Sequence, residues 1–340
     1  MLKKRSWAFF CGCLAILLLL VAAACSRQGG TVELTYSIFF PATHGHTLLA
    51  TEWAKEIEKR TNGAVKINMY PGATLTPADQ CYDGVVKGIS DIGMSVLSYT
   101  KGRFPLTEVI DLPQGYKSGS QVTQLCNAYY EKFKPKELDD VQIMYLHGHG
   151  PGIVHTKKPV TKMEDLKGMK IRCSGTSAKV ASALGATPVA MAQTETYDAL
   201  EKGVVDGLLS PMEALKGWKF VEVTKCTTEN LGSSYSLCFF VAMNKKKWNA
   251  LPKDVQETIQ KVNQEWIPKT GATWNNMDKE AMELAVSKRN QIIKLSPEED
   301  ARWAKAVAPV LEEYVKTTKA KGLPGEEAFN FCRTWLKEHP

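Results

Sequence analysis

The spacing of apolar and polar residues predicts a chain of short strands alternating with helices. Residues 32–38 and 64–70 alternate along their length, which indicates strands, whereas residues 46–61 between them place an apolar stripe on one face of a helix. The same strand–helix–strand order recurs further along and is followed by long helices, beginning near 251–254 and 296–299. This order predicts an α/β fold.

One unit of this pattern occurs twice. Residues 82–95 (YDGVVKGISDIGMS) and 197–210 (YDALEKGVVDGLLS) share their tyrosine, two aspartates, a Lys-Gly pair and a final serine, at an offset of 115 residues. Each copy indicates a helix stopped by glycine and followed by a short strand. Two related lobes would place Ser95 and Ser210 at equivalent strand ends on opposite walls of a cleft. Chance similarity between two ordinary helix–turn–strand units is the alternative.

A late strand predicts that both lobes are discontinuous. Residues 235–243 alternate like a strand that returns to the first lobe after the second has been built. We therefore expect lobe I to contain residues 32–150 and 238–277. Lobe II would contain residues 151–237 and 278–340.

The first residues predict an export signal. A basic start is followed by an apolar run that ends in small residues immediately before Cys25. We expect residues 1–24 to be a signal peptide of the lipoprotein type, 25–31 to be a tether, and Cys25 to carry a lipid. Cleavage by the ordinary signal peptidase and a permanent membrane anchor are the alternatives. The protein would then lie in the periplasm or cell envelope.

Composition excludes some classes of partner. The formal net charge is +7 and falls to +4 once Lys3, Lys4 and Arg5 leave with the signal. No basic run interleaved with aromatic residues indicates nucleic-acid binding. A chain of 340 residues is long enough for two domains with separate cores.

The cysteines and histidines do not predict a metal or redox site. No two of the six cysteines beyond Cys25 form a C-x-x-C pair, and we expect mostly free, buried thiols, with Cys226–Cys238 the least unlikely disulfide. Histidines cluster at two places, but no cysteine or carboxylate completes a ligand set, so no metal and no cofactor are expected. The clustered histidines are His44, His46, His147, His149 and His155.

The strongest candidate for ligand chemistry is Arg172. It stands at the end of a predicted strand, 169–173, and the loop 174–177 then opens a helix. A guanidinium beside a helix N-terminus favours an anion.

At this point the chain resembles the solute receptors of TRAP transporters, the DctP-type extracytoplasmic binding proteins. The resemblance covers roughly Leu34 to Leu336. Its motifs are weak singly and specific in this order. They are Glu52-Trp53-Ala54-Lys55-Glu56, Tyr70-Pro71-Gly72, Gly102-Arg103-Phe104-Pro105, residues 165–172 (DLKGMKIR), Gly185-Ala186-Thr187-Pro188, Glu195-Thr196-Tyr197, residues 203–207 (GVVDG), Met243-Asn244-Lys245, Trp248 and Leu251-Pro252.

The resemblance implies a two-lobe, periplasmic-binding-protein-like fold with a hinged cleft and a long helix spanning both lobes. Such a protein captures a small organic acid and delivers it to the membrane permease subunits of a TRAP transporter. Arg172 matches the arginine that clamps the ligand carboxylate through two parallel N–H donors. Ser210 departs from a position that is often Asn, and Leu209 replaces an acid that helps to hold a metal ion in some members.

The pocket implied in this way is more apolar than usual. Gln193 matches a pocket position, Val96 stands where some members are polar, and aromatic side chains can form walls. We expect a monocarboxylate, such as an aromatic or 2-oxo acid, in preference to a sugar acid. The expected ligand-binding residues are Arg172, Ser210, Gln193, Trp218, Val96, Ser95, Tyr235, His149, Gly152 and Phe40 (or Phe39).

Two other classes of function remain at this stage. A secreted hydrolase is less favoured, because no nucleophile elbow or paired-carboxylate motif is present, and we expect no enzyme activity. A binding protein for another partner, an ABC permease or a sensor kinase, differs from the favoured function only in the residues that carry the resemblance.

Overall fold

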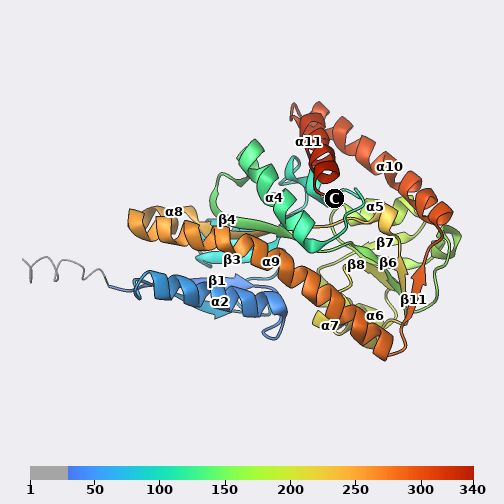
Figure 1. Ribbon diagram of the computed structural model, residues 1–340, viewed down its shortest axis with the longest axis horizontal. Helices are drawn as coiled ribbons and strands as arrows, with labels where there is room; N and C mark the ends of the chain where they lie inside the picture. Colours follow the sequence, from blue (N-terminus) through green and yellow to red (C-terminus); the bar gives the residue numbers. More distant parts are fainter. Residues whose placement is uncertain (1–29) are drawn as a thin grey trace, which may run out of the picture.

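The computed structural model describes residues 30–340 (Figure 1). The predicted signal peptide, residues 1–24, and the predicted lipid site, Cys25, lie outside these residues. Within the described part of the chain, no helix is long and apolar enough to cross a membrane.

The first lobe is built on a five-stranded sheet in the order β2-β1-β3-β10-β4. β1 runs parallel to both β2 and β3, whereas β10 lies between β3 and β4 and is antiparallel to both. The strands are β1 (Val32–Ile38), β2 (Val65–Tyr70), β3 (Ile92–Val96), β4 (Val141–Gly148) and β10 (Cys238–Asn244). The helices that belong to this lobe are α2 (Gly45–Arg60), α3 (Cys81–Lys87), α4 (Gly119–Phe133) and α8 (Lys245–Ala250).

The second lobe is built on a six-stranded sheet in the order β11-β9-β5-β8-β6-β7. β6 is parallel to β7 and β8, while β5 is antiparallel to its neighbours β8 and β9. The strands are β5 (Ile153–Thr156), β6 (Lys170–Cys173), β7 (Thr187–Ala190), β8 (Gly207–Ser210), β9 (Cys226–Glu229) and β11 (Gln291–Lys294). Its short helices are α5 (Ser177–Ala183), α6 (Thr196–Glu201) and α7 (Ala214–Gly217).

One helix joins the two lobes. α9 (Lys253–Ser287) packs on α2, α4 and β4 of the first lobe and on α7 and β11 of the second (Figure 1). At 35 residues it is about 52 Å long, from the 1.5 Å rise per residue. The fold is therefore a two-lobe α/β structure with a helix that spans both lobes, as the family resemblance implies.

The C-terminal helices depart from the expected lobe division, which assigned residues 278–340 to lobe II. α10 (Pro297–Ala320) does pack on α5 of the second lobe, but α11 (Gly325–Glu338) packs on α4 of the first. Its buried residues Ala328 and Cys332 share a core with Cys126 of α4. An amphipathic helix gives no sequence signal for which of two apolar surfaces it covers, which explains the difference.

The two copies of the repeated unit, residues 82–95 and 197–210, have the predicted helix–turn–strand form. α3 is followed by β3 and α6 by β8. The glycines after the helices, Gly88 and Gly203, adopt φ of 77° and 73°, which a side chain rarely tolerates. Each strand ends toward the other lobe, and the site is built from these ends.

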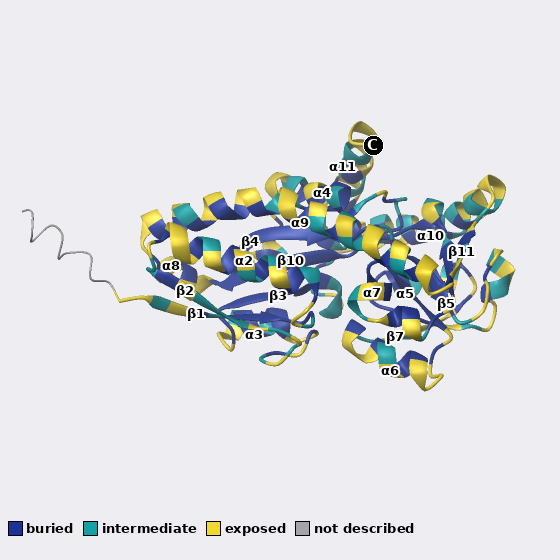
Figure 2. Cartoon of the chain, turned by 60° about the horizontal axis from the view of Figure 1, so that its bottom comes forward, coloured by how far each residue is buried: buried dark blue, intermediate teal, exposed yellow. Residues whose placement is uncertain are grey.

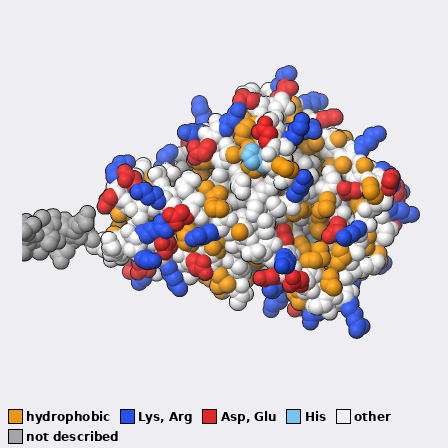
Figure 3. Space-filling view, viewed as in Figure 1, with side chains coloured by type: hydrophobic (Ala, Val, Ile, Leu, Met, Phe, Trp, Pro, Cys, Tyr) orange, Lys and Arg blue, Asp and Glu red, His pale blue; other side chains and the backbone are white. Residues whose placement is uncertain are grey.

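The sheets and the inner helix faces form the buried layers (Figure 2). The six cysteines of the described chain are all buried, and none is paired; Cys226 and Cys238 lie in different sheets. Figure 3 shows basic and acidic side chains interspersed over one face, in keeping with the small net charge. The surface therefore offers no broad field of one sign on this face.

Candidate functional site

A cleft lies between the two lobes where β3 and β10 of the first lobe meet β6 and β8 of the second. The lobes are nearly closed on it, because the remaining cavity has a volume of about 30 Å³, room for one or two water molecules. The lining residues are Phe39, Phe40, Val96, Tyr99, His149, Arg172, Gln193, Ser210, Pro211, Glu213, Trp218, Tyr235, Leu237, Phe239 and Trp274.

The structure brings together eight of the ten predicted site residues. Ser95 and Gly152 are the exceptions. Ser95 precedes Val96 on β3, and because adjacent residues of a strand face opposite ways, its hydroxyl donates instead to the Ala78 carbonyl at 2.7 Å. The prediction that Ser95 and Ser210 lie on opposite walls of the cleft is therefore wrong for Ser95, and only Ser210 lines it.

Gly152 supports the cleft without lining it. Its N–H donates to the Tyr235 carbonyl at 2.7 Å, and a Cβ at this position would lie 2.3 Å from the Tyr235 ring. Only glycine therefore allows Tyr235 to take its place in the wall.

Arg172 is the one lining residue with a permanent positive charge. It lies on β6 between β7 and β8, and its side chain is 3 % exposed. Its Nε and Nη2 donate to the Met191 carbonyl at 3.2 and 2.8 Å, which leaves the edge formed by Nη1 and the second Nη2 hydrogen free. Within residues 30–340, no carboxylate pairs with it.

Other arginines show how unusual this is. Arg60, Arg103 and Arg302 each pair with two carboxylates, and all three are at least partly exposed. A buried cation without a counter-ion is costly, and a ligand carboxylate removes that cost. The loop 174–177, predicted to share in anion binding, does not line the cleft; Thr176 instead donates to Glu108 of the first lobe at 2.7 Å.

Ser210 and Gln193 form a polar pair beside Arg172. The Gln193 Nε2 donates to the Ser210 Oγ at 3.2 Å, so the hydroxyl hydrogen of Ser210 remains free. Behind this pair, His155 Nε2 lies 3.1 Å from the Ser210 carbonyl and Nδ1 lies 3.0 Å from the Thr227 hydroxyl. His155 therefore fixes the end of β8 from within lobe II and is not a cleft residue.

Aromatic side chains make up most of the remaining wall. Phe39 stacks on Phe40 at 4.3 Å between ring centroids and on Trp218 of the other lobe at 5.9 Å. Phe239 lies parallel to Phe39 at 6.4 Å. The rings present flat apolar faces on both sides of the cleft, which suits an aromatic or otherwise flat apolar body.

The sequence missed several lining residues. Phe239 alternates with the core residue Phe240 on β10, so strand periodicity carried a signal for it. Trp274 gave none, because it enters from the middle of α9, where an apolar residue is expected to be core. The missed residues are Tyr99, Pro211, Glu213, Leu237, Phe239 and Trp274.

Four histidines pack around the Trp274 ring: His149, which lines the cleft, and His44, His46 and His147, which lie behind it. Trp274 Nε1 donates to His147 Nδ1 at 3.1 Å, and the tilted His46 ring contacts the same indole with 3.9 Å between ring centroids. Burial lowers the pKa of His147 to about 3 and that of His149 to about 4, so both are neutral near pH 7. Within residues 30–340, no group of three or more potential metal ligands is present.

Polar contacts also cross the cleft. His44 Nε2 of the first lobe lies 3.1 Å from Glu213 Oε2 of the second. The Glu213 N–H donates to Asp278 Oδ1 of α9 at 2.8 Å. Burial, with the Glu213 charge adding to it, raises the pKa of Asp278 to about 7. The Gln193 N–H of the second lobe donates to the Tyr99 hydroxyl of the first at 3.0 Å.

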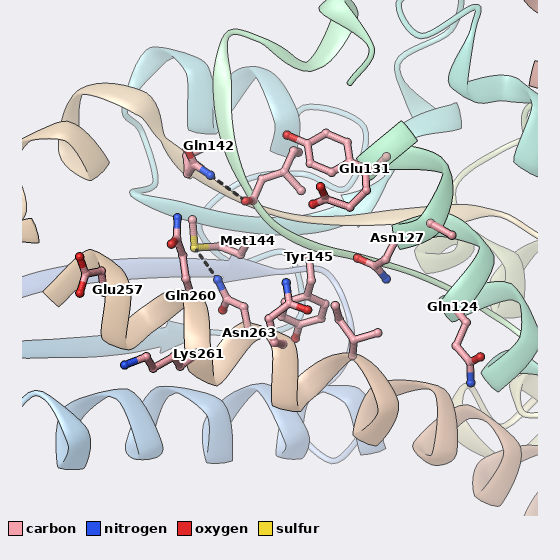
Figure 4. A pocket seen from close by; sticks show the side chains of 15 residues that line it. Gln124, Asn127, Glu131, Gln142, Met144, Tyr145, Glu257, Gln260, Lys261 and Asn263 are labelled. Carbon is pink, nitrogen blue, oxygen red and sulfur yellow. Dashed lines mark hydrogen bonds between the residues drawn. The ribbon is translucent and has the colours of Figure 1, made fainter. Parts of the chain in front are cut away.

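A larger hollow of about 760 Å³ lies within the first lobe, between α4, β4 and α9 (Figure 4). Six of its lining side chains are amides, and Asn263 contacts the Met144 sulfur within it. None of the predicted residues lines it, and it contains no arginine. The interlobe cleft is therefore the candidate site.

The cleft geometry agrees with the family that the sequence matches. Residues 37–318 match the family described as "Bacterial extracellular solute-binding protein, family 7". The chain belongs to this family. Its members bind solutes outside the cytoplasm.

Three solved structures show the relationship in more detail. A TRAP periplasmic solute-binding protein from Desulfovibrio salexigens, described as an open complex, is 33% identical, with 90% of this chain and 96% of the other covered and a TM-score of 0.79. A TRAP protein from Rhodoferax ferrireducens, in complex with copurified benzoate, is 29% identical, with 91% and 98% covered and a TM-score of 0.86. One from Bordetella bronchiseptica, with bound (R)- and (S)-mandelate, is 30% identical, with 91% and 100% covered and a TM-score of 0.84.

Proposed function

We propose that this protein captures a monocarboxylic acid with an aromatic or apolar body in the interlobe cleft and delivers it to the membrane subunits of a TRAP transporter. The acid is bound and released unchanged. The protein acts outside the cytoplasm, held at the membrane by a lipid on Cys25.

The buried, unpaired guanidinium of Arg172 carries the proposal. Its free Nη edge offers two parallel donors, which match the two oxygens of a carboxylate. The same cleft contains no second free cation among the described residues, so one carboxylate suffices.

The aromatic wall supports a flat apolar body for the ligand. Phe39, Trp218 and Phe239 could hold a ring between the lobes in place of their present contacts with one another. The benzoate and mandelate bound by two of the related proteins have this character. Both carry one carboxylate and one ring.

The ligand must enter an open form. A cavity of about 30 Å³ is smaller than the 300–1,000 Å³ typical of ligand pockets, so the lobes must part before an acid can bind. Ligand binding then favours closure through contacts that both lobes make with it.

The experiment is a thermal-shift screen of the chain from Gly30 onward against paired compounds: benzoate with benzamide, and phenylacetate with phenylacetamide. A ligand at about a hundred times its Kd adds about 2.7 kcal/mol of stability. We expect shifts from the acids only. Arg172→Ala should abolish them, while Arg333→Ala, at an exposed arginine of α11, should keep them.

Equal shifts from acids and amides would refute the carboxylate clamp. Retention of acid binding in Arg172→Ala would do the same. Turnover of any bound acid would refute the proposal of binding without catalysis.

A further inference from the structure

The cleft contains a buried hydrogen-bond acceptor that a carboxylate cannot satisfy. His149 is 1 % exposed and lines the cleft, and its Nε2 has no hydrogen-bond partner within the described chain. Leaving a buried polar atom without a partner costs about 1–3 kcal/mol. An atom of this kind at a binding site therefore points to a group on the ligand.

The other ring nitrogen fixes what that group must be. His149 Nδ1 lies 2.5 Å from the Gly150 carbonyl oxygen. A carbonyl oxygen only accepts hydrogen bonds, so Nδ1 carries the proton and donates it. Burial, together with the positive charge of Arg172, lowers the pKa of His149 to about 4, and the ring stays neutral. Nε2 is then a lone pair that accepts a hydrogen bond and cannot donate one.

The ligand group that meets His149 Nε2 must donate a hydrogen bond and should carry no positive charge. The field of Arg172 that disfavours a protonated His149 also disfavours an ammonium group on the ligand. A neutral hydroxyl has no such penalty. It can also accept, and the unpartnered Nε1–H of Trp218 in the same cleft is a donor. A hydroxyl can therefore donate to the His149 acceptor and accept from the Trp218 donor.

We propose that His149 selects hydroxy-carboxylic acids, accepting at Nε2 a hydrogen bond from a ligand hydroxyl that lies close to the carboxylate held by Arg172. This rests on the proposed function and names the ligand class within it. The hydroxyl is placed near the carboxylate because His149 and Arg172 line the same small cavity of about 30 Å³. A 2-hydroxy acid with an aromatic body provides all three groups: a carboxylate for Arg172, a neutral hydroxyl for His149 and a flat ring for the aromatic wall.

The test compares the affinities of four acids for the wild-type protein, measured by isothermal titration calorimetry. Mandelate carries the 2-hydroxyl, phenylacetate lacks it, 2-methoxy-2-phenylacetate (O-methylmandelate) keeps the oxygen without the donor, and phenylglycine replaces the hydroxyl with an ammonium. We expect mandelate to bind at least tenfold more tightly than each of the other three, since a site built for a hydroxyl rejects analogues that leave its acceptor unpaired.

Two variants connect the preference to the residue. His149→Phe removes the acceptor and should reduce the ratio of mandelate to phenylacetate affinity to near one. His149→Gln, which retains an acceptor oxygen, should restore part of it. A long-range ¹H–¹⁵N spectrum of the free protein should show the Nδ1–H tautomer of His149.

The outcomes separate this inference from the function on which it rests. Phenylacetate or the methoxy acid binding as tightly as mandelate overturns the role of His149 and leaves the carboxylate clamp intact. Preference for phenylglycine also overturns it. If none of the four acids binds the wild-type protein, the inference falls together with the choice of an aromatic acid. A preference for mandelate that persists undiminished in His149→Phe assigns the hydroxyl to another residue and overturns the proposal.

Discussion

Asp278 should make the stability of this protein fall as the pH rises from about 4 to about 7. Its carboxyl is buried on α9 beside Glu213, and both features raise its pKa from 3.8 to about 7. Between these values the folded protein keeps a proton that the unfolded chain has lost. The folded state is therefore progressively disfavoured as the pH rises through this window.

The magnitude follows from the shift. About three pH units at 1.36 kcal/mol each give at most about 4 kcal/mol. Asp278→Asn keeps the oxygen that accepts from the Glu213 N–H and cannot ionise. The variant should match the wild type near pH 4 and exceed its stability by up to about 4 kcal/mol at pH 8, which corresponds to roughly 5–10 °C in Tm.

Thermal unfolding across pH 4–8 measures this difference directly. Glu283→Gln is the matched control, because Glu283 lies on the same helix and is exposed. The buried histidines His147, His149 and His155 have lowered pKa values and make stability fall toward acid, but they do so equally in wild type and variant. A wild-type-minus-variant difference that does not change with pH would refute the reasoning.

Two further predictions concern the scaffold. Trp274→Phe should lower the free energy of unfolding by about 1–3 kcal/mol, because His147 Nδ1 loses its donor. The control is Trp335→Phe, since the Trp335 indole N–H donates to no group within residues 30–340, and equal losses in urea denaturation would contradict this. Gly203→Ala should cost about 1 kcal/mol, since φ is 73° and no atom lies within 4 Å of the new Cβ. Gly207→Ala should cost more, because its Cβ would meet a backbone oxygen at 2.4 Å, and the opposite ranking in thermal unfolding would show that space matters less than φ.

Local periodicity was enough to predict the fold class and the strand-ending units of both lobes. The alternation in 235–243 even indicated that β10 returns to the first sheet. The position of α11 could not be predicted in this way, because its apolar stripe fits any apolar surface and only the folded arrangement selects α4.

The site was predictable where a residue closes a strand and unpredictable where tertiary packing decides. Arg172 could be predicted because it is charged and lies near the end of a strand, β6. The prediction for Ser95 was wrong, because the similarity between the two copies of the repeated unit does not show which face of its strand each serine occupies. Trp274 was missed because nothing local separates a tryptophan that packs into the core from one that reaches a cleft.

The placement of β10 has a consequence for how the chain folds. β10 is an inner strand of the first sheet, flanked by β3 and β4, yet it comes about ninety residues after β4. A nascent chain that ends before residue 238 leaves both of those strands with an unpaired edge, so the first lobe cannot complete its sheet until most of the second has been synthesised. Contacts of such long sequence separation form slowly, because closing a long loop costs entropy before any pairing is gained. A slow-folding chain stays unfolded for longer after synthesis, which favours passage through a channel that admits only unfolded polypeptide.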